Sequence, residues 1–213
     1  GRVSTDHLLE SLQDLPYKEM EFAKVDLHRF LRRGFPEVIY ARGKSANQII
    51  AIARVLKGSG HPVVITKVDP ELSKILGGRA AWLQNFPEAQ IMAGPFPKSN
   101  GHGRSKKLSV LVATAGTSDI PVAEEAVVTL QLMGCSAKRL FDIGVAGLHR
   151  LLRHRRSLRG AHVIVVVAGM DGVLPSVVSG LVNRPVVAVP TSVGYGASFK
   201  GIAPLLTMLN SCS

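Results

Sequence analysis

The stretch Val163-Ile164-Val165-Val166-Val167-Ala168 is a run of six apolar residues, and Gly169 follows it directly. A short run that is apolar throughout and rich in β-branched residues predicts a strand buried on both faces, as in parallel sheets covered by helices on either side. Further strand patterns at 108–113, 139–143 and 186–190 alternate with helical patterns at 122–133, 147–155, 174–182 and 197–210. This alternation predicts a three-layer α/β/α fold with a parallel sheet over residues 105–213.

The first half of the chain has a less regular pattern, which predicts a smaller α/β module. Its helical segments are expected at 4–15, 25–33 and 45–56, and its strands at 37–41, 63–66 and 90–93. The polar stretch 97–107 has no apolar periodicity and is typical of a linker. We therefore expect two domains, a small module with its linker over 1–104 and a larger α/β/α domain over 105–213.

Composition and charge narrow the class of protein. No apolar run approaches the roughly 20 residues that span a bilayer, so no membrane segment is expected. Cys135 and Cys212 lack any ligand or CxxC spacing, which favours a reducing compartment, the cytoplasm or an organelle interior, over a disulfide or zinc framework. The first residues, 1–4, begin no signal pattern, and whether a leader has been removed stays open. The formal charge of +11 indicates attraction to phosphates in general.

The positive charge is densest at 149–159, where leucines at helical spacing are expected to face inward and arginines outward. A solvated helix face is the favoured interpretation, and contact with an anionic substrate or another subunit is the alternative. Nucleic-acid binding is not expected, because no aromatic side chains are interleaved for base stacking.

Four loops directly after the predicted strands hold the candidate binding residues, because ligands bind beyond the carboxyl ends of strands in such sheets. Glycines allow close approach of backbone N–H groups to an anion, and the following helix N-terminus favours negative charge. Each loop alone is equally typical of a tight turn with a helix cap, yet four at one edge favour a shared nucleotide site. The candidates are Gly116, Thr117, Ser118, Asp119, Gly144, Gly169, Met170, Gly172, Thr191, Ser192, Gly194, Tyr195 and Gly196.

Well-known phosphate and catalytic motifs fail in detail. Gly43-Lys44-Ser45 matches the end of a P-loop, but Val38 stands where the first glycine belongs, which argues against an ATPase. Gly194-Tyr195-Gly196 begins like a dinucleotide fingerprint, but Phe199 replaces the third glycine. No Gly-x-Ser-x-Gly or His-Glu-x-x-His signature occurs, so serine hydrolase and zinc enzyme lack support. The sequence leaves any metal ligands unknown.

Asp171 and Cys212 are the candidate catalytic side chains. Asp171 follows a strand in an apolar, glycine-rich setting, where partial burial would suit general acid/base work, although it could simply cap the helix near Leu174. Cys212 offers a thiol nucleophile, although a helix C-terminus disfavours the thiolate and an inert terminal cysteine is the plainer interpretation.

The second half resembles the aminoimidazole ribonucleotide (AIR) carboxylase superfamily. The shared elements are Gly116-Thr117-Ser118-Asp119, Ala168-Gly169, Leu174-Pro175 and Pro185-Val186-Val187-Ala188-Val189-Pro190. This resemblance implies an AIR-carboxylase-like, flavodoxin-like sheet. The purine enzymes place a catalytic histidine just before the Leu-Pro pair, where this chain has Val173, and that difference disfavours purine carboxylation.

A longer resemblance links nearly the whole chain to the nickel-pincer cofactor carboxylases of the LarB type. It rests on Ala168-Gly169-Met170-Asp171-Gly172-Val173-Leu174-Pro175-Ser176-Val177-Val178, on Pro190-Thr191-Ser192-Val193-Gly194-Tyr195-Gly196, on Met208-Leu209-Asn210-Ser211-Cys212, and on the upstream Arg32-Arg33-Gly34-Phe35-Pro36-Glu37-Val38-Ile39-Tyr40.

This resemblance implies carboxylation of the pyridinium ring of nicotinic acid adenine dinucleotide by CO2 or bicarbonate, with phosphoanhydride hydrolysis that releases AMP. It implies Cys212 as nucleophile, Asp171 as the group that removes the ring proton, and a homo-oligomer, an octamer in relatives. Mg²⁺ is allowed for, and no tightly bound organic cofactor is expected. The alternatives are an AIR carboxylase or N5-carboxyaminoimidazole ribonucleotide mutase activity in purine biosynthesis, and a non-catalytic nucleotide or RNA binder.

Overall fold

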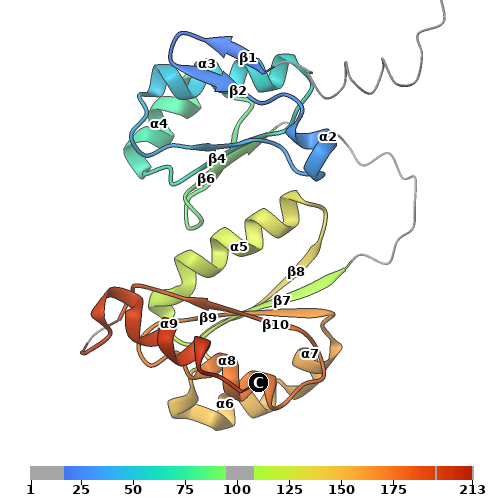
Figure 1. The fold of residues 1–213 in the computed structure, drawn as a ribbon, viewed down its shortest axis with the longest axis vertical. Helices are drawn as coiled ribbons and strands as arrows, with labels where there is room; N and C mark the ends of the chain where they lie inside the picture. The colour runs from blue at the N-terminus through green and yellow to red at the C-terminus, as the bar shows by residue number, and fades with distance from the viewer. Residues whose placement is uncertain (1–16, 95–107, 195, 213) are drawn as a thin grey trace, which may run out of the picture. The chain divides into compact units, whose positions relative to one another are not determined.

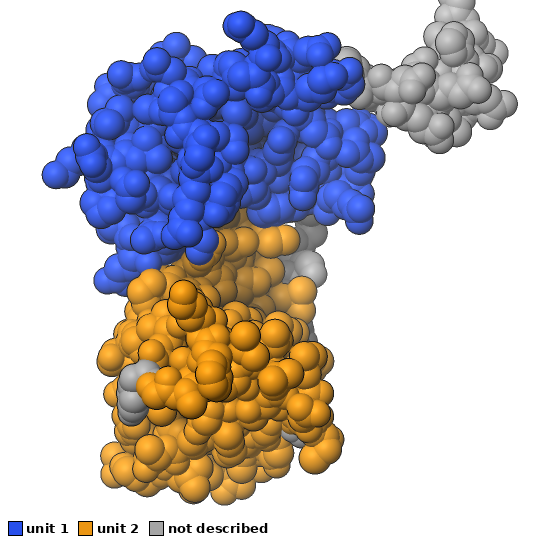
Figure 2. All heavy atoms as spheres, turned by 60° about the vertical axis from the view of Figure 1, so that its left-hand side comes forward, with its two compact units in different colours: residues 1–100 blue, residues 101–213 orange. Residues whose placement is uncertain are grey.

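The computed structural model describes residues 17–94, 108–194 and 196–212. The chain divides into two compact units, residues 1–100 and 101–213, which are coloured separately in Figure 2. The expected boundary at 104/105, the linker at 97–107 and the helix at 4–15 lie outside the described residues. Each unit is described by itself.

The second unit contains a sheet of four parallel strands. They are β7 (Ser109–Thr114), β8 (Ser136–Leu140), β9 (Val163–Ala168) and β10 (Val186–Pro190), in the order β10-β9-β7-β8. The chain leaves β7 toward β8 on one side, and β9 then pairs with the other side of β7. The order of strands therefore reverses between β7 and β9, which is where doubly wound sheets open a ligand crevice.

Helices cover both faces of this sheet (Figure 1), so the predicted three-layer α/β/α class is confirmed. On one face α5 (Ile120–Leu132) packs Ala123 and Val127 against β7 and β9. The other face carries α6 (Leu148–Arg153), α7 (Arg155–Gly160) and α8 (Leu174–Ser179). Because Ile164 and Val166 face the second layer and Val163, Val165 and Val167 the first, β9 is apolar throughout.

Several elements of the second unit differ from the predicted ranges. The strand expected at 139–143 is β8 at 136–140, because Asp142 has a φ of 58° and its backbone N–H donates to Oγ1 of Thr114 instead of continuing the ladder. The helix expected at 147–155 is divided into α6 and α7 at His154. Leu151 and Leu158 are buried as expected, whereas Leu152 is exposed.

The C-terminal helix is shorter than predicted. It was expected over 197–210, but α9 runs over Ile202–Leu209 after a 3-10 turn at Phe199–Gly201. Lys200 and Gly201 have φ values of 55° and 100°, and the left-handed region cannot continue a right-handed helix. The helix expected at 174–182 likewise ends earlier, because α8 stops at Ser179.

The first unit contains a mixed sheet of order β3-β4-β6-β5. Strands β3 (Val38–Tyr40) and β4 (Val63–Thr66) are parallel, and β6 (Ile91–Gly94) runs antiparallel to both β4 and β5 (Gln84–Phe86). Helix α3 (Ala46–Gly58) begins at a capping box of Ser45 and Gln48, and α4 (Pro70–Arg79) begins at Asp69, which caps it. Ile49, Leu56, Ile65 and Leu76 are fully buried between these elements.

Four elements of the first unit were not predicted: the hairpin of β1 (Lys18–Met20) and β2 (Ala23–Val25), helix α4 and strand β5. The helix expected at 25–33 is wrong at its start, because Val25 lies in β2 and only α2 (Arg29–Arg33) is helical. Among the described residues no helix combines the length and the apolar character needed to cross a membrane.

Candidate functional site

The loops at the carboxyl edge of the second unit's sheet enclose a cavity of about 390 Å³. It lies at the point where the strand order reverses, and its size is within the range of small-ligand sites. Each of the four strands contributes through the segment that follows it. The lining residues are Ala115, Gly116, Thr117, Ser118, Asp119, Asp142, Gly144, Val145, Ala146, Arg150, Gly169, Met170, Asp171, Val193 and Gly194.

Most of the predicted site residues meet at this cavity. The structure brings together Gly116, Thr117, Ser118, Asp119, Gly144, Gly169, Met170, Asp171 and Gly194. Tyr195 lies outside the described residues. The predicted residues that do not line the cavity are Gly172, Thr191, Ser192, Gly196 and Cys212.

Asp119 is buried at the floor of the loops, and both of its carboxylate oxygens are bonded within the protein. Oδ2 accepts the backbone N–H of Gly116 at 3.1 Å, and Oδ1 accepts the hydroxyl of Thr191 at 2.8 Å. Thr191 is itself buried and follows β10, whereas Asp119 follows β7. The carboxylate therefore joins two loops. Asp119 also lines the cavity, and the substrate-binding role that the sequence pattern indicates for it stays a prediction.

Glycine is required at two places where loops approach each other. A Cβ on Gly169 would lie 2.0 Å from the carbonyl oxygen of Val193, and one on Gly144 would lie 2.8 Å from that of Ala115. Both distances are shorter than real Cβ contacts. These glycines therefore permit close packing between neighbouring loops, and that packing shapes the cavity.

Asp171 lines the cavity but is exposed, so the partial burial expected for it is wrong for this chain. Its Oδ1 accepts the backbone N–H of Val173 at 3.3 Å, immediately before α8. This is a turn contact to the residue that precedes Leu174, and α8 has no side-chain hydrogen bond that caps its first turn, so Asp171 does not cap the helix. The bond occupies one oxygen and leaves Asp171 at the wall of the cavity.

Cys212 is exposed and lies just beyond α9. The hydroxyl of the adjacent Ser211 is 2.8 Å from that of Ser176, which anchors the end of the chain to α8. Since Cys212 is not among the residues that line the cavity, a single chain does not place the thiol and Asp171 in one cavity.

Asp142 and Arg150 also line the cavity and were not among the residues predicted from the sequence. Arg150 Nη1 lies 2.9 Å from Asp142 Oδ2, and Arg150 is the one cation among the described residues that line the cavity. Arg150 belongs to the basic stretch 149–159, for which a solvated helix face was the favoured interpretation. The alternative, contact with an anionic substrate, is the one that would have indicated Arg150. Because Asp142 is paired and Asp119 is bonded internally, Asp171 is the least engaged acid at the cavity.

A metal site built by the protein is not evident in the described part of the chain. Within residues 17–94, 108–194 and 196–212, no group of three or more His, Cys, Asp or Glu side chains is placed to hold a metal ion. Mg²⁺ is commonly bound through substrate phosphates with few protein ligands.

Comparison with known proteins agrees with this architecture. Residues 17–94 match the LarB/PurE-like N-terminal domain, and residues 109–213 match the AIR carboxylase family. An uncharacterized protein of Methanocaldococcus jannaschii is 40% identical over 219 residues, which cover the whole of this chain and 84% of that protein. The N5-carboxyaminoimidazole ribonucleotide mutase of the same organism is 32% identical over 101 residues, 46% of this chain and 59% of that enzyme.

The fold, with its cavity at the strand-order reversal, is that of an AIR-carboxylase-like α/β protein. More particularly, the chain belongs to the AIR carboxylase superfamily, in the group that carries a LarB-like N-terminal domain. Its activity is of the carboxylase or mutase type.

Proposed function

We propose that this chain carboxylates the pyridinium ring of nicotinic acid adenine dinucleotide and hydrolyses its phosphoanhydride, which releases AMP. The observation that carries the proposal is the combination of a LarB-like N-terminal domain with an AIR carboxylase domain that has Val173, not histidine, before Leu174. Without that histidine, a purine-type reaction would need a different acid or base near position 173. The acid that the cavity offers near that position is Asp171, which the proposed reaction uses.

The chemistry uses a thiolate and a carboxylate. The Cys212 thiolate adds to the electron-poor ring, and the adjacent carbon becomes nucleophilic enough to form a bond to CO2. Asp171 then takes the proton from that carbon, the carbon–sulfur bond breaks, and aromaticity returns with the thiolate released. Separately, water adds to a phosphorus of the phosphoanhydride and AMP leaves. Mg²⁺ would accompany the phosphates.

Binding of the anionic substrate would rest on the loops and on Arg150. Thr117 and Ser118 line the cavity in the 3-10 turn ahead of α5, where hydroxyl and backbone donors are available. Arg150 can hold a phosphate or carboxylate in two parallel hydrogen bonds if it exchanges its contact with Asp142. These groups offset the negative charge of the cavity's acids.

We further propose that the active form is a homo-oligomer. Helix α9 presents Ile202, Leu205, Leu206 and Leu209 to solvent, with Leu209 71% exposed, and Phe199 before it is 69% exposed. An apolar helix face of this kind is typical of a protein–protein contact. A second copy packed there would also give Cys212 a neighbouring cavity to reach. Leu209→Glu is expected to shift sedimentation toward smaller species, whereas a parent chain that sediments as a stable monomer would refute the proposal.

The test of the reaction is incubation with nicotinic acid adenine dinucleotide, ¹³C-bicarbonate and Mg²⁺, followed by mass spectrometry. AMP and a labelled dicarboxylated mononucleotide are expected from the parent chain, whereas Cys212→Ala and Asp171→Asn should form no labelled carboxylated product. Asp171→Glu is the matched control, because it keeps a carboxylate and should retain turnover. Labelled carboxylated product formed equally by the Cys212→Ala variant would rule out the thiolate mechanism.

The second candidate is a purine-type carboxylase or mutase, which is favoured by the 32% identity to the mutase over 46% of this chain. Turnover of aminoimidazole ribonucleotide or its N5-carboxy derivative, without turnover of the dinucleotide, would select it. Inactivity on both, with salt-dependent RNA binding, would instead select a non-catalytic binder.

A further inference from the structure

A second cavity, also of about 390 Å³, lies in the first unit at the carboxyl ends of the parallel strands β3 and β4. The loop after β3 leads into α3, and the loop after β4 leads into α4. The edge where parallel strands end is the usual position for a ligand in α/β units. The residues that line this cavity are Ala41, Arg42, Gly43, Lys44, Lys67, Asp69, Glu71, Leu72 and Ile75.

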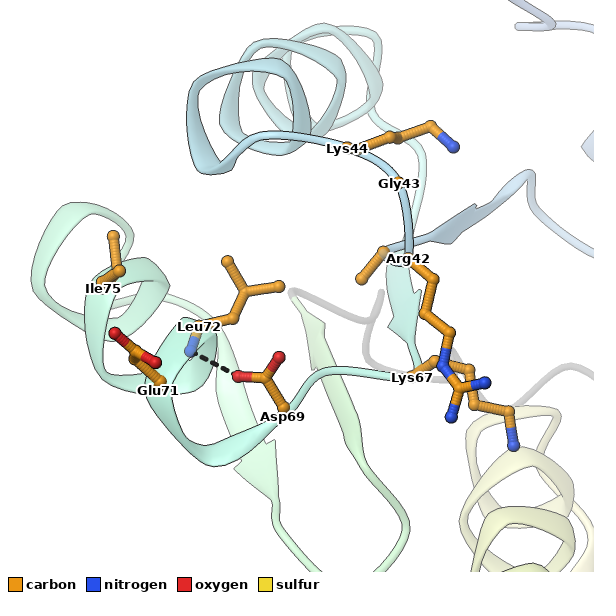
Figure 3. A pocket seen from close by; sticks show the side chains of 9 residues that line it. Arg42, Gly43, Lys44, Lys67, Asp69, Glu71, Leu72 and Ile75 are labelled. Carbon is orange, nitrogen blue, oxygen red and sulfur yellow. Dashed lines mark hydrogen bonds between the residues drawn. The ribbon is translucent and has the colours of Figure 1, made fainter.

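Positive and negative side chains occupy opposite sides of this cavity. Figure 3 shows Arg42, Lys44 and Lys67 on the side of the two strand ends, and Asp69, Glu71 and Leu72 on the side of α4. The three cations come from two separate loops. The head groups of Arg42 and Lys67 lie near each other, whereas the ammonium of Lys44 points away from them (Figure 3). An anion bound beside Arg42 and Lys67 would meet a guanidinium and an ammonium together, which is an arrangement suited to phosphate groups.

The loop after β3 carries the triplet Gly43-Lys44-Ser45, which the sequence analysis rejected as a P-loop. In the structure this triplet does join a strand to a helix, and Gly43 has a φ of 77°. The hydroxyl of Ser45 accepts the N–H of Gln48 and so serves as the helix cap. Lys44 Nζ donates to the carbonyl oxygen of Tyr40 at 2.9 Å, so its ammonium is engaged by the backbone of β3.

The loop after β4 is shaped by Lys67, whose φ of 59° lies in the left-handed region although it is not glycine. Residues held in that region cost roughly 1 kcal/mol or more and tend to occur at ligand sites. The following Asp69 is exposed and uses one oxygen to cap α4 through the N–H of Leu72 at 2.8 Å. Its other oxygen and the carboxylate of Glu71 can accept hydroxyl hydrogen bonds.

The geometry points to a binding site for a nucleoside monophosphate in this cavity. The cations of Arg42 and Lys67 would hold the phosphate, the carboxylates of Asp69 and Glu71 the sugar hydroxyls, and the apolar Leu72 and Ile75 a face of the base. The site lies in a different unit from the carboxylase cavity, so it stands independently of the reaction proposed above.

The test uses hydrogen–deuterium exchange of the full chain, read peptide by peptide, with AMP, adenosine or inorganic phosphate at constant ionic strength. AMP is expected to slow exchange in peptides over 41–50 and 67–76, adenosine is not, and inorganic phosphate acts more weakly. Because the readout is local, binding in the second unit cannot be mistaken for it.

The variant Arg42→Gln/Lys67→Gln should weaken AMP protection of these peptides by at least about tenfold in concentration, since each charged hydrogen bond contributes appreciably. Lys18→Gln/Arg54→Gln changes the net charge of the same unit equally and should leave the protection intact. Equal protection by adenosine, loss in the control, or no protection at 41–50 and 67–76 would overturn the proposal. Phosphate protecting as strongly as AMP would refute the nucleoside part and leave a phosphate site.

Discussion

The hydroxyl of Thr191 donates a 2.8 Å hydrogen bond to Oδ1 of Asp119, and this bond joins the loop after β10 to the loop after β7. Both residues are buried, so the contact is shielded from water. Thr191→Val keeps the shape of the side chain but leaves a buried carboxylate oxygen without its donor. We expect the free energy of unfolding to fall by about 1–3 kcal/mol, and KM for the substrate to rise, because the two loops frame the cavity.

The matched control is Thr129→Val, where the lost hydroxyl bonds only to the backbone carbonyl of Glu125 one turn earlier in α5. That carbonyl belongs to the helix ladder, so the change should cost much less. Urea unfolding and steady-state kinetics of the two variants distinguish them. Equal stability of Thr191→Val and the parent would show that the buried bond does not hold the loops.

Gly169→Ala is expected to damage the same cavity by crowding. The added Cβ would lie 2.0 Å from the carbonyl oxygen of Val193 and 2.6 Å from Oγ1 of Thr191, so one loop must move. Overpacking of this kind costs about 1–3 kcal/mol or more, and the displaced loop should lower kcat/KM as well. Thermal unfolding and activity assays measure the two effects.

Gly180→Ala is the comparison for that substitution. Gly180 has a φ of −65° at the end of α8, and its nearest neighbours to a Cβ are 3.7 Å away. Alanine fits there and should be neutral or slightly stabilising. If both glycine variants behaved alike, the close approach of the loops after β9 and β10 would not be the reason for Gly169.

Much of the second unit could be predicted because its strands are long, apolar and regularly spaced. β9 and β10 have the expected limits, since each is a continuous apolar run, although only β9 is largely buried and β10 is an edge strand with Val187 exposed. The start of β8 was predicted three residues too late, because an edge strand with the sequence Ser136-Ala137-Lys138 carries little apolar signal. The short elements of the first unit failed for the same reason.

The candidate site was predictable as a place but less so as a set of contacts. Parallel topology brings the four loops to one edge, and this alone locates Gly116, Gly169 and Asp171 together. The pairing of Asp142 with Arg150 depends on the left-handed backbone conformation of Asp142 and on the short helix α6, which holds Arg150. No local sequence pattern predicts either feature. Whether Asp119 binds substrate or braces a loop depends on Thr191, 72 residues away.

Two carboxyl groups of the first unit predict a pH dependence of stability. Burial raises the pKa of Glu37 above its ordinary value of 4.5, and the N–H of Asp26 offsets this only in part. The folded chain therefore holds this proton more tightly than the unfolded chain, so the contribution of Glu37 to stability falls as pH rises from about 4.5 through the raised value. Burial also opposes ionisation of Asp26, but hydrogen bonds from Arg32 and from the N–H of His28 lower its pKa overall.

Glu37→Gln isolates the first effect, because the amide oxygen can still accept the N–H of Asp26. The variant should gain stability relative to the parent between pH 4 and pH 7, since only the parent acquires a partly buried charge. The contribution of Asp26 has the opposite sign, being lost as pH falls below 3.8, and both chains share it. Urea unfolding followed by the fluorescence of Trp82, the one tryptophan, reports on this unit. Parallel pH profiles would contradict the assignment to Glu37.

The separation of Cys212 from the cavity that contains Asp171 predicts complementation between inactive variants. If each active site takes its acid from one copy and its thiol from another, Cys212→Ala and Asp171→Asn chains should each be inactive alone, with losses of about 100-fold or more. Mixed under conditions that let subunits exchange, they should regain activity, with about a quarter of the parent's sites restored when equal amounts are combined at random. A thiol and acid from the same chain predict no recovery, because every site then lacks one of the two groups. Adding Leu209→Glu to both variants is the control, since a helix α9 that no longer packs on a second copy should abolish the recovered activity.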